Sequence, residues 1–238
     1  MRYYRVATTA ALLVLAMAIG SAQVEKKPIT GIARLKAGNE RFVSDPATPP
    51  PADVEKRKAL VKGQTPFAMV LSCADSRVPP EMIFNVGLGE LFIIRTAGQV
   101  TDKAVLASIE YGAEHLNVPL LVVMGHDSCG AVKAAIETKA GAPSLGPNLD
   151  ALIGAIKPAF ERMSTPADLD HLRDAVLANV EEVVNDILTS SAVVKHLVGI
   201  GTLQMVGAFY ELDTGRVRFS KPVSPQHEPS GKTPDAHW

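Results

Sequence analysis

The chain has 238 residues, of which 47% are hydrophobic and 21% charged, and its formal net charge is −1 at pH 7. A near-neutral chain without a basic run argues against nucleic acid and against an anionic membrane surface as partners. The length is sufficient for one compact domain with a substantial core.

Residues 1–22 have the pattern of a signal peptide. Met1 to Arg5 is a short basic start, Val6 to Ile19 is uncharged and rich in Ala and Leu, and Gly20 to Ala22 offers small residues for cleavage. The apolar stretch is shorter than the ~20 residues that a membrane-spanning helix needs. We therefore expect cleavage after about Ala22. The mature chain would be exported, to the periplasm of a Gram-negative source, and would keep no membrane anchor.

Helical and extended patterns then alternate along the chain. Helices are predicted over residues 26–43 (an N-terminal arm), 52–62, 102–115, 130–139, 148–163 and 167–188. Compact apolar runs predict strands at 67–71, 91–94, 118–124 and 197–209, with a short C-terminal edge strand at 216–219. This alternation predicts an α/β fold with a mainly parallel central sheet flanked by helices. A single domain would cover 23–221, and the polar, Pro-rich residues 222–238 predict a flexible tail.

Three side chains with affinity for metal ions follow the predicted strands. Cys73 comes just after the first strand, His126 just after the third, and Cys129 stands three residues further on, at a predicted helix start. Functional sites in parallel sheets form at the carboxyl ends of strands. Two thiolates and one imidazole are a known catalytic zinc set, with the fourth position open to water. The sequence therefore predicts one zinc ion per chain.

The two cysteines also allow a different interpretation. An even number of cysteines in an exported protein usually indicates a disulfide. A non-catalytic exported domain stapled by a Cys73–Cys129 bond therefore stays open as an alternative.

Asp75 and Arg77 lie close to the first cysteine. They could form an ordinary surface ion pair, which contributes little to stability. In a zinc site they would have distinct roles: the carboxylate would orient a zinc-bound hydroxide, and the arginine would hold the carboxylate away from the metal. If Arg77 released it, Asp75 could itself occupy the fourth zinc position and close the site.

The combined motif resembles the β-class carbonic anhydrases. Cys-x-Asp-x-Arg is followed about fifty residues later by His-x-x-Cys, and the likeness runs from roughly Ile29 to Ser220. The resemblance implies a zinc lyase that reversibly hydrates CO2 to bicarbonate and a proton through zinc-bound hydroxide. Asp75 and Arg77 would be its catalytic dyad. It also implies a dimer or a higher even oligomer in which the N-terminal arm embraces a partner.

The same resemblance implies three substrate-binding residues. Gln64 would donate a hydrogen bond to substrate or bicarbonate, while Phe92 and Tyr111 would line the cleft, partly from the neighbouring subunit. The pattern alone equally allows Phe92 as a core residue of a strand and Tyr111 as a residue of an apolar helix.

Two further features bear on how far the resemblance extends. Family members whose site closes carry tryptophan three residues before the first cysteine. This chain has Val70 there, and the resemblance therefore implies a site that stays open. The segment from Arg95 to Gly98 departs from the family's Arg-Asn pattern. Hydrolases of carbonyl sulfide and carbon disulfide share the fold and the zinc set, so these substrates stay open as alternatives.

Overall fold

The structure is a computed structural model that describes residues 30–48 and 53–224. The predicted signal peptide and most of the predicted tail lie outside the described residues and stay predictions. The helices are α1 (Gly31–Ser44), α2 (Val54–Ala59), α3 (Pro80–Ile83), α4 (Lys103–Glu110), α5 (Gly130–Glu137), α6 (Pro147–Ile156), α7 (Leu172–Ser190) and α8 (Ala192–Gly199). Short 3₁₀ segments, η1 (Leu60–Lys62), η2 (Ala97–Gln99) and η4 (Lys157–Arg162), and a π-helical turn, η3 (Tyr111–His115), complete the list.

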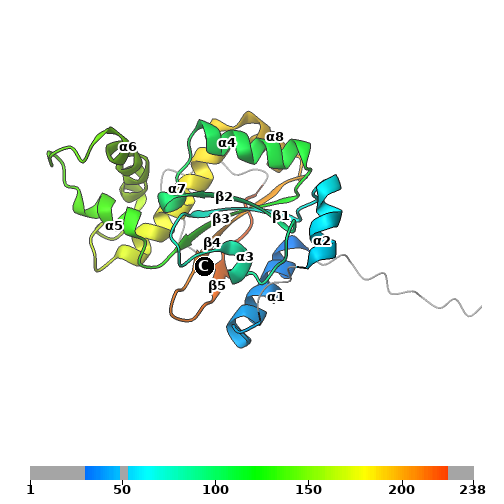
Figure 1. Cartoon of the computed structure of the whole chain (residues 1–238). Helices are drawn as coiled ribbons and strands as arrows, with labels where there is room; N and C mark the ends of the chain where they lie inside the picture. Colours follow the sequence, from blue (N-terminus) through cyan, green and yellow to red (C-terminus); the bar gives the residue numbers. More distant parts are fainter. Residues whose placement is uncertain (1–29, 49–52, 225–238) are drawn as a thin grey trace, which may run out of the picture.

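A five-stranded sheet forms the centre of the molecule (Figure 1). Its strands are β1 (Ala68–Cys73), β2 (Leu91–Thr96), β3 (Leu120–His126), β4 (Gln204–Tyr210) and β5 (Val217–Phe219), in the order β2-β1-β3-β4-β5. The first four strands run parallel, and β5 pairs antiparallel with β4 at one edge. The predicted fold class, including the short C-terminal edge strand, is confirmed.

Helices cover both faces of this sheet. Along β1, Met69 and Leu71 pack on one face with α4, α7 and α8, whereas Val70 packs on the other face with α1 and the segment around α3. Every residue of β1 and of β3 is buried. Burial on both faces explains why these strands are continuous apolar runs and do not alternate with polar residues.

The structure corrects the predicted strand over residues 197–209. The first part of that run belongs to α8, and β4 begins only at Gln204. The hydroxyl of Ser191 caps α8 by accepting the N–H of Val194 at 3.1 Å, and Gly201, with φ of 75°, lies in the turn that follows the helix. Apolar residues suit a buried helix as well as a buried strand, so the hydrophobic run alone did not separate the two.

Two smaller differences concern helix starts. The helix predicted from residue 167 begins at Leu172, because His171 has non-helical backbone angles and the preceding residues form turns. The short helix α3 was not predicted; it begins with Pro80, whose fixed φ suits a first helical position.

The described part of the N-terminal arm packs on its own chain. The amide of Asn39 in α1 donates to the carbonyls of Ile83 and Gly215, at 3.1 and 2.8 Å, and accepts the N–H of Val217 at 2.9 Å. Gly38 lies so close to Phe84 that an added Cβ would stand 1.8 Å from its carbonyl oxygen. These contacts fix α1 against α3 and β5, and an embrace of a partner stays a prediction.

The residues just past the predicted domain limit contact the sheet. Val223 donates its N–H to the carbonyl of Met205 in β4 at 2.8 Å, two residues beyond residue 221. No helix in residues 30–48 and 53–224 combines the length and the hydropathy that crossing a bilayer requires.

Candidate metal centre

Two neighbouring strands bring Cys73 and His126 to the same edge of the sheet. Cys73 ends β1, His126 ends β3, and the two strands are parallel and hydrogen-bonded to each other. The chain turns after His126 and enters α5, with Cys129 as its N-cap residue. The predicted position of Cys129 at a helix N-terminus is confirmed.

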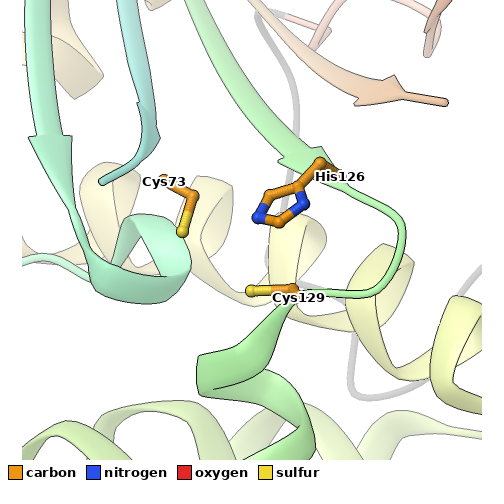
Figure 2. Close-up of side chains that lie close together, drawn as sticks. All are labelled: Cys73, His126 and Cys129. Carbon is orange, nitrogen blue, oxygen red and sulfur yellow. The ribbon is translucent and has the colours of Figure 1, made fainter. Parts of the chain in front are cut away.

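The three side chains converge (Figure 2). Their ligand atoms all lie within 4.8 Å of one another, and all three residues are buried. Nδ1 of His126 lies 2.8 Å from the carbonyl oxygen of Asp127, whereas its buried Nε2 has no hydrogen-bond partner among the described residues. A buried polar atom without a partner is costly, and metal coordination would satisfy it. The donor set therefore fits a metal ion.

Both cysteines are free thiols in the structure, so the disulfide of the alternative interpretation is not formed. A hydrogen bond from the Cys129 thiol lowers the pKa of Cys73, against the opposing effect of burial. The same pairing, together with burial, raises the pKa of Cys129. The backbone N–H of Gly98 also donates to Sγ of Cys73, at 3.3 Å. The N–H of Gly98 thus favours an anionic Cys73 sulfur, and anionic sulfur is the form that binds metals.

Asp75 and Arg77 form a two-point ion pair beside these ligands. Nη2 of Arg77 lies 2.7 Å from Oδ2 of Asp75, and Nε lies 2.9 Å from Oδ1, which also accepts the Arg77 backbone N–H at 2.9 Å. These hydrogen bonds hold the pKa of Asp75 well below its usual range, so the carboxylate is ionised. Its Oδ2 lies 3.9 Å from Nε2 of His126. The pair therefore adjoins the metal-binding atoms and is more than a distant surface contact.

Two residues that sequence reasoning did not select help to hold this loop. Arg95 donates from Nε to the carbonyl of Cys73 at 2.9 Å and from Nη2 to the carbonyl of Asp75 at 2.6 Å. The carbonyl of Ser128 accepts Nη2 of Arg77 at 3.2 Å, which joins the loops of β1 and β3. Ser128 has a positive φ of 53°, which a sequence pattern does not reveal for serine. Arg95 belongs to the segment that departs from the family's Arg-Asn pattern, but nothing in the sequence indicated that its side chain would donate to the carbonyls of Cys73 and Asp75.

The structure does not bring Gln64, Phe92 and Tyr111 to the metal ligands of the same chain. Gln64 precedes the amino end of β1, and Phe92 pairs with Met69, four residues before Cys73 along the strand. That separation is roughly 13 Å at 3.3 Å per residue. Tyr111 is 46% exposed, and its ring centroid lies 6.2 Å from that of Phe92. Their predicted roles would need a second subunit and stay predictions.

Sequence comparison relates most of the chain to one family. A family profile described as carbonic anhydrase matches residues 68–217. Carbonic anhydrase 2 of Mycobacterium tuberculosis is 41% identical over 196 residues, which cover 79% of this chain and 91% of that protein. The carbonic anhydrase of Mycolicibacterium smegmatis is 38% identical, covering 80% of this chain and 92% of its own length.

Solved structures show the same fold. The β-carbonic anhydrase of Coccomyxa in complex with acetazolamide superposes with a TM-score of 0.62 at 27% identity, covering 81% of this chain and 86% of that one. A tetrameric β-carbonic anhydrase of Sordaria macrospora superposes with a TM-score of 0.59, covering 77% of this chain and 90% of that one; its identity is 23%, so this likeness concerns the fold alone.

Proposed function

Because the chain belongs to the β class of the carbonic anhydrase family, whose reaction is the reversible hydration of CO2, we propose that it performs this reaction with one zinc ion. Cys73, His126 and Cys129 would hold the metal. The observation that carries the proposal is the convergence of these three buried ligands within 4.8 Å, with an ionised carboxylate beside them. Two soft thiolates and an imidazole suit zinc, and they leave a fourth position for water or substrate.

The side chains around the metal position have separable tasks. Bound zinc would activate water for attack on the carbon of CO2. Asp75 is ionised and lies 3.9 Å from the free nitrogen of His126, so its carboxylate can accept a hydrogen bond from that water and orient it. The guanidinium of Arg77 donates hydrogen bonds to both carboxylate oxygens of Asp75. These bonds support an open site in which Asp75 does not bind the metal.

The first test is the reaction itself. We expect purified, zinc-loaded protein to hydrate CO2 rapidly in a stopped-flow assay with a pH indicator, at mildly alkaline pH. Carbonyl sulfide and carbon disulfide would be offered to the same preparation, with hydrogen sulfide release as the readout. Hydration of CO2 without sulfide release supports the proposal. Sulfide release without CO2 hydration would assign the same site to the alternative substrates.

We further propose that the protein assembles as a dimer or a higher even oligomer. Support comes from the placement of Phe92 and Tyr111, two aromatic residues that the family resemblance assigns to the substrate cleft but that lie away from the metal ligands of their own chain. A neighbouring subunit could present them to the site. The Sordaria macrospora structure of the same fold is described as tetrameric.

Analytical ultracentrifugation measures the assembly directly. We expect a sedimenting mass of two or four chains, and loss of that species when Tyr111 is replaced by Glu, which places a charge on the aromatic pair. A single-chain mass for the unaltered, active protein would contradict this proposal while leaving the zinc site in place.

A further inference from the structure

The turn η2, which follows β2 beside the metal centre, has an unfavourable local conformation. Gly98 has φ of 65° and Gln99 has φ of 47°, so two successive residues are left-handed. Gln99 is fully buried, and both polar atoms of its side chain lack a hydrogen-bond partner within the described residues. A left-handed non-glycine residue and an unpaired buried amide each cost free energy. This turn therefore depends on its surroundings to keep its shape.

One residue of α7 supplies a direct constraint on that turn. Asn179 is fully buried in the middle of the helix, and its Nδ2 donates to the carbonyl of Gly98 at 2.9 Å. On the other side of the same residue, the N–H of Gly98 donates to Sγ of Cys73 at 3.3 Å. A continuous series of hydrogen bonds thus leads from α7, through one glycine, to a metal-binding sulfur.

The packing around Gly98 leaves little room for a different arrangement. A Cβ at this position would lie 3.0 Å from Cδ1 of Ile156 and 3.2 Å from Cβ of Ala131. Both the positive φ and this close approach require glycine, and glycine is also the residue with the greatest backbone freedom. Both backbone hydrogen-bonding groups of Gly98 have partners, the carbonyl in Asn179 and the N–H in Cys73, and together they restrain this freedom.

We propose that Asn179 is a positioning residue of the metal centre, acting through Gly98 on the sulfur of Cys73. A hydrogen bond to a metal-bound thiolate withdraws negative charge from the sulfur and fixes its direction, and such outer contacts tune both metal affinity and the electronic properties of the metal. The inference rests on the proposed zinc site. Asn179 lies outside both ligand motifs, so its effect on the metal would not be expected from those motifs.

The test compares Asn179→Leu with Ile187→Ala. The first variant removes the donor and keeps a side chain of similar size, while the second disturbs the same helix two turns further on, at another fully buried residue. Two properties are measured in each: the sulfur-to-cobalt charge-transfer absorption of the Co²⁺-loaded protein, and the zinc dissociation constant in competition with a chromophoric chelator. Asn179→Ala, which fits a helix well, serves as a second variant if the leucine protein does not fold.

We expect the Asn179 variant to shift the charge-transfer band and to weaken zinc binding by about tenfold or more. Ile187→Ala should lower the melting temperature but leave the band and the zinc affinity close to those of the unaltered protein. An unchanged band and affinity in the Asn179 variant would overturn the inference alone. Failure of the unaltered protein to bind either metal would overturn the zinc site and the inference together.

Discussion

Replacing Cys73 by Ser is expected to remove the bound zinc and, with it, CO2 hydration. The substitution exchanges one sulfur for an oxygen that stays protonated at neutral pH and is a poor ligand for zinc. Only His126 and Cys129 would remain, one ligand fewer than the three protein ligands of a typical catalytic zinc site. We expect metal content to fall from about one zinc per chain to a small fraction of that, and hydration to fall to the uncatalysed rate. Elemental analysis of dialysed protein and the stopped-flow assay measure the two effects.

Ser72→Ala is the matched control for this substitution. Ser72 precedes Cys73 in β1 and is also buried, and its hydroxyl has no hydrogen-bond partner within the described residues. Removing that hydroxyl should therefore leave zinc content and activity unchanged. One zinc per chain and full activity in the Cys73→Ser protein would show that the metal, if it is needed, binds elsewhere.

The outcome for the ligands shows what sequence spacing can predict. Cys73 and His126 each follow a compact apolar run, and parallel strands that are buried on both faces produce such runs. The carboxyl ends of parallel strands lie at one edge of the sheet, so two residues that follow strands are expected to meet there. This reasoning needs only the strand assignments and the parallel topology, and the structure does bring the side chains of Cys73 and His126 together with that of Cys129.

Features that depend on backbone conformation, or on contacts between residues far apart in the sequence, could not be predicted from spacing. The positive φ of Ser128 and Gln99 has no signature in residue type, and the contact of Asn179 with Gly98 joins residues that are 81 positions apart. The boundary between α8 and β4 was missed for a related reason, because both elements contribute apolar residues to the same core cluster, Val194 and Val198 from α8 and Met205 from β4. Local pattern constrains the periodic elements, whereas such contacts are set by tertiary packing.

Replacing Asp75 by Asn is expected to separate catalysis from metal binding. The amide has nearly the same shape as the carboxylate and can still accept one hydrogen bond from Arg77, but it carries no charge and has one acceptor oxygen in place of two. Asp75 is not one of the three converging ligands, so we expect zinc content to stay near one per chain. Loss of a carboxylate that orients the reacting water should lower kcat/KM on the order of 100-fold or more. Stopped-flow hydration and elemental analysis of the same preparation give both numbers.

Asp127→Asn makes the same change of charge in the neighbouring loop. The Oδ2 of Asp127 accepts the N–H of Leu212 at 3.1 Å, a contact that asparagine can keep, and the carboxylate contributes to the electrostatic environment of Arg77. If Asp75 acts by direct contact with the reacting water, this control should retain most of its activity. An equal loss in both variants would reduce the role of Asp75 to its charge near the metal, and full activity in Asp75→Asn would exclude it from the reaction. A strong and specific loss in the Asp75 protein, with zinc retained, would establish that the carboxylate held by Arg77 takes part in the reaction.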